Sequence, residues 1–103
     1  MRENSFLGVP SEDLPDIVVQ RIEEQISRDL GGEGVILNLK KNTYHGLDAV
    51  GTRIWDLISE PRRIGEVLEI LLEEYEVEAG RCEDDLLELL QDLSDQDLIK
   101  VSI

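Results

Sequence analysis

Cys82 and His45 are the two side chains of this chain whose types could form a nucleophile and its base. A catalytic cysteine needs a histidine within hydrogen-bond reach and a third group that orients the histidine. Cys82, however, falls on the apolar face of a predicted helix, where a thiol usually packs as a small hydrophobic group. His45 lies in a short predicted strand, either as a surface or packing residue or as part of a binding face. We therefore expect the chain not to be an enzyme.

The sequence also gives little indication of a metal site or a cofactor site. One cysteine and one histidine are too few for a zinc cluster. The acidic run at 83–85 lies in the first turns of a predicted helix, where carboxylates complement the helix dipole. Gly31, Gly32 and Gly34 lie between two predicted strands, whereas a phosphate-binding loop is followed by a helix. We expect no metal and no cofactor, which leaves a binding function.

The 103 residues are enough for one domain, and their charge restricts the partners. Ten Lys and Arg against 24 Asp and Glu give a net charge of −14, which repels nucleic acids and anionic membranes. The 41% hydrophobic content is too high for a disordered acidic tail. A single cysteine fits a reducing compartment, and neither a signal peptide nor a membrane-spanning run is visible. We expect a folded, acidic, cytoplasmic protein.

The first half of the chain predicts an arm followed by strands. Residues 1–22 read as an irregular arm, in which 17–19 either pair as a strand or pack over an apolar edge. Three strands over 25–30, 35–39 and 43–46, with turns at 31–34 and 40–42, form an antiparallel meander. The apolar run at 35–39 predicts a strand buried largely on both faces. The third strand is an open edge unless the arm covers it, and an open edge suits the addition of an extended peptide.

The second half predicts three helices, so that the fold class is α+β. Asp48 is a good N-cap for a helix that ends near Ser59, and apolar stripes predict further helices over 64–75 and from about Gly80 to Leu93. Residues 98–103 form a short extended end. We expect the three helices to cover one face of the three-stranded sheet. Leu87 lies beside the apolar stripe of the third helix, either as a singly exposed residue or as the wall of a groove.

Three segments carry a resemblance to a known family. They are Gly34-Val35-Ile36-Leu37-Asn38-Leu39, Thr43-Tyr44-His45-Gly46-Leu47-Asp48 and Val50-Gly51-Thr52-Arg53-Ile54-Trp55-Asp56-Leu57-Ile58. Together with Pro61-Arg62, the run 71–77 and Leu98-Ile99, they make residues 25–100 resemble the PqqD-like family. One departure is Asp97, where the family usually has glycine. Aspartate tolerates the left-handed backbone conformation better than most residues, so we expect the helix end to be preserved.

The resemblance implies a winged helix-turn-helix-like fold and a recognition function without catalysis. Members of the family act as recognition elements for ribosomally synthesised, post-translationally modified peptides (RiPPs). They hold the leader segment of a precursor peptide as a strand added to the third strand, against the third helix. A discrete protein of this size resembles the recognition protein of lasso-peptide pathways, with a leader peptidase and a cyclase as partners. The alternatives are another RiPP or cofactor pathway such as PQQ synthesis and, less favoured by the charge, a DNA-binding regulator.

The resemblance also implies the binding residues, and we place the peptide-recognition domain at 23–103. The third-strand positions are Thr43, Tyr44, His45 and Gly46, and the third-helix wall consists of Cys82, Glu83, Leu86, Leu87 and Leu90. Asp85 matches an acidic family position, as a cap, a packing residue or a ligand-binding residue, and Trp55 is either a core or a ligand-contacting residue. The acidity predicts that a basic leader associates faster at low salt. The oligomeric state is left open, because the free strand edge also permits a dimer.

Overall fold

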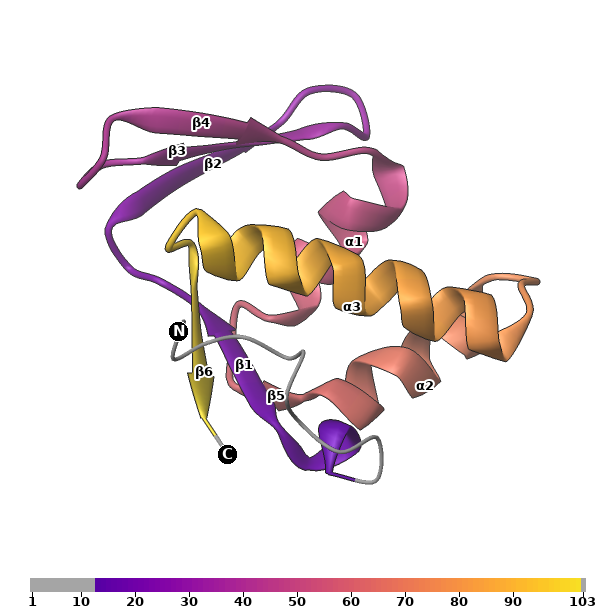
Figure 1. Ribbon diagram of the computed structural model, residues 1–103. Helices are drawn as coiled ribbons and strands as arrows, with labels where there is room; N and C mark the ends of the chain where they lie inside the picture. The colour runs from indigo at the N-terminus through magenta and orange to yellow at the C-terminus, as the bar shows by residue number, and fades with distance from the viewer. Residues whose placement is uncertain (1–12, 103) are drawn as a thin grey trace.

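The computed structural model describes residues 13–102, which form two sheets and three α-helices (Figure 1). Residues 1–12 of the predicted arm and Ile103 lie outside the described residues. The strands are β1 (Val18–Arg21), β2 (Gln25–Asp29), β3 (Gly34–Asn38), β4 (Thr43–Gly46), β5 (Arg62–Arg63) and β6 (Ile99–Ser102). The helices are α1 (Ala49–Leu57), α2 (Ile64–Glu74) and α3 (Ala79–Asp95), preceded by a single 3₁₀ turn, η1 (Leu14–Asp16).

The first sheet is the predicted meander, with the strand order β2-β3-β4 and antiparallel pairing throughout. Its two turns use left-handed backbone conformations. Gly31 and Gly32 have φ of 72° and 95° in the β2–β3 turn, and Asn42 has φ of 56° in the β3–β4 turn. The meander and the positions of both turns are confirmed, and β4 forms one edge of this sheet.

A second antiparallel sheet, with the order β5-β1-β6, joins the two ends of the described chain. β1 pairs with β6 from Val18↔Ser102 to Arg21↔Ile99, and with the two residues of β5 on its other side. The segment 17–19, for which the sequence left two possibilities, therefore contributes to a strand. Ile17 and Val19 are buried, with 1% and 0% of their surface exposed. This sheet is an addition to the predicted arrangement.

The apolar run of β3 is buried on one face only, so the prediction that both faces are buried is wrong. Gly34, Ile36 and Asn38 are buried, whereas Val35 and Leu37 are half-buried. The reason is that no element packs against the outer face of the β2-β3-β4 sheet within the described residues. Val35 and Leu37 are instead flanked only by their neighbours across the strands.

The helices lie mainly between the two sheets. α1 contacts β3, whereas α3 contacts α2 and β6. α2 lies on the far side of α3 from the β2-β3-β4 sheet, so the three helices do not all cover one sheet face as predicted (Figure 1). The core combines residues of both sheets with the inner faces of all three helices. No helix within residues 13–102 is long and apolar enough to cross a membrane.

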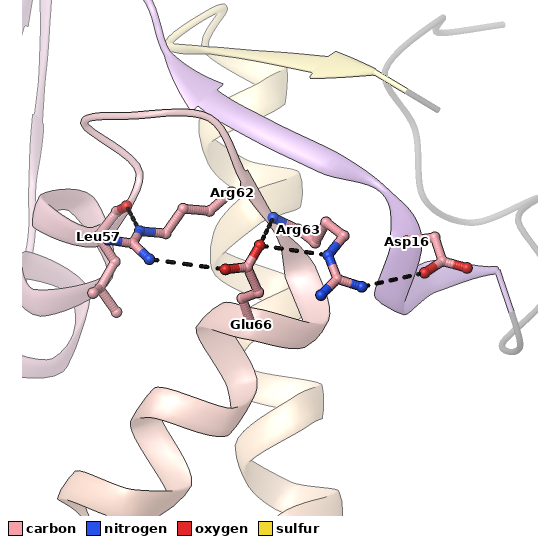
Figure 2. Close-up of polar contacts among 5 residues, drawn as sticks. All are labelled: Asp16, Leu57, Arg62, Arg63 and Glu66. Atoms are coloured by element: carbon pink, nitrogen blue, oxygen red, sulfur yellow. Dashed lines mark hydrogen bonds and ion pairs between the residues drawn. The ribbon is translucent and has the colours of Figure 1, made fainter.

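Polar contacts at β5 connect the second sheet to the helices (Figure 2). Arg62 donates from Nε to the Leu57 carbonyl oxygen at the end of α1, over 2.6 Å. Arg63 forms ion pairs with Asp16 of η1 at 3.7 Å and with Glu66 of α2 at 3.4 Å. Exposed ion pairs of this kind contribute little to stability. The Arg62 hydrogen bond joins the segment before α2 to the end of α1, and the Arg63 ion pairs join it to η1 and to the first turn of α2.

Candidate functional site

β4 has an open edge within the described part of the chain. It pairs with β3 from Val35↔Gly46 to Asn38↔Thr43, and none of residues 13–102 pairs with its other side. An edge strand of this kind presents unpaired N–H and C=O groups to which another extended chain can bind. The described end of the predicted arm, 13–22, belongs to the other sheet and does not cover β4. Among residues 13–102, nothing therefore blocks strand addition at this edge.

A groove of about 580 Å³ lies directly beside this edge. We call it the β4–α3 groove, and it is lined by His45, Gly46, Leu47, Asp48, Val50, Gly51, Ile54, Leu71, Tyr75, Val77, Arg81, Cys82, Asp85, Leu86, Glu88, Leu89 and Asp92. Its floor is aliphatic and includes residues of all three helices. Val50 and Val77 are 41% and 50% exposed, so apolar surface is open to an incoming side chain. A volume of this size accommodates a few side chains of a peptide.

The structure brings five of the predicted site residues together in this groove. They are His45 and Gly46 of β4 and Cys82, Asp85 and Leu86 of α3. Alternation along β4 explains why His45 faces the groove: its cross-strand partner is Ile36, whose side chain is fully buried. Tyr44 therefore points to the opposite face of the sheet, where it is 80% exposed.

The other predicted residues of α3 lie outside the groove lining. Leu90 is fully buried in the core, Leu87 is half-buried against the core, and Glu83 is exposed. Thr43, at the start of β4, is exposed and also does not line the groove. The lining of α3 instead continues through Glu88, Leu89 and Asp92, which the sequence-based selection did not contain. Their spacing from Asp85 by three, four and seven residues, a helical stripe, is the signal that could have identified them.

The chemistry of the groove fits binding better than nucleophilic catalysis. Burial raises the pKa of the Cys82 thiol, and the neighbouring Asp85 carboxylate raises this pKa further. The thiolate that a cysteine nucleophile needs is therefore disfavoured at neutral pH. Among the described residues, no group of three His, Cys, Asp or Glu side chains is arranged to hold a metal ion. The polar lining of α3 contains Asp85, Glu88 and Asp92 against the single Arg81, which favours a ligand without excess negative charge.

Comparison with known protein families identifies the family of this chain. The family model for coenzyme PQQ synthesis protein D (PqqD) matches residues 33–99. The chain belongs to the PqqD family. The resemblance in the sequence is thereby confirmed, and so is the α+β fold class. No curated protein sequence matches the chain.

Two solved structures are similar to this PqqD-family chain. TbiB1 in complex with the TbiA(beta) leader peptide has 36% identity and a TM-score of 0.73, over 79% of this chain and 94% of that one. A lasso peptide synthetase B1 complexed with the leader peptide has 21% identity and a TM-score of 0.70, over 80% of this chain and 96% of that one. The second likeness shows the shared fold, and the first also supports membership of the family.

The family segment 48–58 positions the site by joining α1 to the sheet and to α2. The Asp48 carboxylate accepts from the Gly51 N–H at 2.7 Å, which confirms the predicted N-cap of α1. Trp55 is 3% exposed, so it is a core residue, and its indole N–H donates to the Ser27 hydroxyl of β2 at 2.8 Å. Arg53 binds Glu74 at the end of α2 through two hydrogen bonds of 2.9 and 2.7 Å. These contacts fix two walls of the β4–α3 groove.

Asp97, the departure from the family pattern, preserves the helix end as expected. Its φ of 55° is left-handed, the conformation that glycine usually supplies at this position. The Asp97 N–H donates to the Ser94 carbonyl oxygen and the Leu98 N–H to that of Leu93, which is the Schellman pattern. Leu93 and Leu98 are both buried, so the end of α3 is also fixed by an apolar contact across this turn.

Proposed function

We propose that this chain is a non-enzymatic recognition protein for the leader segment of a ribosomally synthesised precursor peptide. The leader pairs as an added strand with β4 and places alternate side chains in the β4–α3 groove. The chain then presents the precursor to separate modifying enzymes, a leader peptidase and a lasso cyclase. In this proposal the chain supplies binding and orientation, and the enzymes supply the chemistry.

One observation carries the proposal: the open edge of β4 lies directly beside an apolar groove to which β4 itself contributes His45 and Gly46. Main-chain hydrogen bonds at a strand edge give affinity, and pockets for alternate side chains give specificity. The similarity to TbiB1, which is complexed with a leader peptide, supports the same ligand class. A recognition protein of a cofactor pathway such as PQQ synthesis is the alternative within the family, and it would use the same groove.

The test measures binding of the fluorescein-labelled TbiA(beta) leader peptide to the full chain by fluorescence anisotropy. A peptide of the same composition in scrambled order is the control. We expect saturable binding of the leader peptide, and we expect the largest NMR shift changes in the ¹⁵N-labelled protein at the amides of β4 and of 82–92. Mass spectrometry should show the peptide uncleaved after incubation.

A second probe distinguishes a chain that binds only its own leader peptide from a chain that binds no leader peptide at all. A random peptide library displayed on mRNA is selected against the same protein. Enrichment of peptides that shift the β4 amides supports the proposal even if the TbiA(beta) leader is not a ligand. If neither probe yields a peptide that binds β4, the proposed function is wrong.

A further inference from the structure

The outer face of the β2-β3-β4 sheet carries a row of apolar side chains that ends at the open edge. The register pairs Ile26 with Leu37 and Leu37 with Tyr44, so the three residues form one line across the sheet. This line lies on the face opposite Ile36, which is buried beneath the sheet. Ile26 is 45% exposed and Tyr44, at the edge, is 80% exposed. We call these three residues the outer row.

No acidic residue occupies the positions of β2, β3 and β4 that point to the outer face, although the chain has a net charge of −14. Just before β2, the exposed Glu24 carboxylate forms an ion pair with Lys40 at 3.6 Å. The strand positions beside the outer row on this face are Arg28, Val35 and Gly46, and none of them is acidic. Carboxylates of the sheet lie elsewhere, as Asp29 does at the end of β2. This apolar face therefore suits an uncharged neighbour rather than the basic one that the rest of the surface would attract.

A strand that pairs with the open edge of β4 would continue the outer row beyond Tyr44 with one of its own side chains. In a sheet, side chains directly opposite each other on adjacent strands are about 4.5–5.5 Å apart at Cβ and interact. A peptide added to β4 therefore places one side chain next to Tyr44 on the outer face, while the residues on either side of it point to the β4–α3 groove.

We propose that the bound leader is recognised on both faces of the sheet, and that its residue opposite Tyr44 is apolar or aromatic. This inference rests on the proposed function and specifies its ligand. The side chain opposite Tyr44 packs against the phenol ring and extends the outer row by one strand. Gly46 supports the assignment, because the space where its Cβ would lie has no atom within 4 Å. The outward residue beside Gly46, two positions away along the peptide, therefore has room for a large side chain.

A second copy of the chain is a weaker occupant of this edge. Two chains that each carry −14 repel each other. Three side chains in one row also bury far less than the roughly 1,200–2,000 Å² of a stable protein–protein interface. A short extended peptide needs no such area at the outer face, because β4 and the groove supply the rest of its binding surface.

The experiment is a double-mutant cycle between Tyr44 and the peptide. Each residue of the TbiA(beta) leader, or of a library-selected peptide that binds, is replaced by serine in turn, and the Kd is measured with wild-type, Tyr44→Ser and Tyr44→Phe proteins. We expect Tyr44→Ser to weaken binding about threefold to tenfold, and Tyr44→Phe to leave it nearly unchanged. The loss should disappear for one serine-substituted peptide, the one that lacks the facing apolar residue. Leu30→Ser, at a 66% exposed residue in the β2–β3 turn, is the matched control and should not alter the Kd.

Three results would overturn the inference. The first is an unchanged Kd for Tyr44→Ser, together with a much weaker Kd for the groove variant Leu89→Asp. The inference would then be wrong, and the proposed function would stand. The second is coupling of Tyr44 to a polar or charged peptide residue. The third is a dimer, found by sedimentation, that Tyr44→Ser dissociates without changing the affinity for the peptide, because the occupant of the edge is then a second copy. Failure of the wild-type protein to bind any peptide would refute the proposed function itself.

Discussion

Leu89→Asp is the substitution that tests the β4–α3 groove most directly. Leu89 is half-buried on the groove side of α3, so part of its side chain remains for a ligand to cover. Covering the remaining half of a leucine contributes about 1 kcal/mol to binding. A carboxylate at the same place would lose water against an apolar ligand without gaining a partner, at a cost of about 1–3 kcal/mol. The sum of about 2–4 kcal/mol predicts a Kd weakened roughly 30- to 1,000-fold.

Leu87→Asp is a matched control on the same helix. Leu87 is also half-buried against the core, but it does not line the groove. The two variants introduce the same charge at a comparable burial and should lose similar amounts of folding stability, which circular dichroism and urea titration would measure. Fluorescence anisotropy with the labelled leader peptide then compares their Kd values. A folded Leu89→Asp protein with wild-type affinity, or a larger loss for Leu87→Asp, would show that the peptide does not lie in this groove.

Three further predictions concern the support of the site. Ser27→Ala removes the acceptor of the buried Trp55 indole N–H and should lower the free energy of unfolding by about 1–3 kcal/mol, measured by urea titration with tryptophan fluorescence; an unchanged midpoint would contradict this. Asp97→Val should lower the free energy of unfolding by about 1–2 kcal/mol because a β-branched residue resists positive φ, whereas Asp97→Gly should not lower it; equal melting temperatures for both variants would contradict this. Iodoacetamide should modify Cys82 slowly at neutral pH and faster as the pH rises, because burial raises the pKa of this thiol. Saturating peptide should slow the reaction, and equal rates with and without peptide would place the peptide elsewhere.

The elements with strong local signals are those that the sequence predicts well. Asp48 caps α1, the glycines at 31 and 32 have positive φ, and the edge position of β4 follows from the order of a simple meander. The second sheet depends on long-range pairing instead. β1 and β6 are about eighty residues apart in the sequence, and the residues of neither strand indicate which other strand it pairs with. Local patterns therefore predict an extended end at 98–103 and leave a strand at 17–19 as one of two possibilities, but they predict neither β5 nor the sheet that the three strands form.

The candidate site was harder to predict because α3 has two flanks beside its apolar stripe. At about 100° per residue, Glu83 and Leu87 fall on one flank of the stripe centred near Leu86, and Asp85 and Leu89 fall towards the other. The helical wheel alone does not say which flank faces β4. That is decided by how α3 crosses beneath the first sheet, and this crossing is set by the packing of α2 and β6 on α3 (Figure 1). The groove lining consequently follows the flank of Asp85 and Leu89.

The same helix explains why a winged-helix-like shape here serves a peptide better than DNA. A DNA-reading helix needs basic side chains near the phosphates, because neutralisation of the backbone supplies most of the affinity. In α3, Arg81 is the only basic residue, against six carboxylates. Much of that negative charge borders the β4–α3 groove. A peptide main chain, which has no net charge, would not be repelled there, and a basic leader would be attracted. The positions of β2, β3 and β4 that share the outer face with Tyr44 carry no carboxylate, so the two faces of an added strand would meet different chemistry. A leader whose groove-facing and outward residues alternate in character would satisfy both faces, and a nucleic acid would satisfy neither.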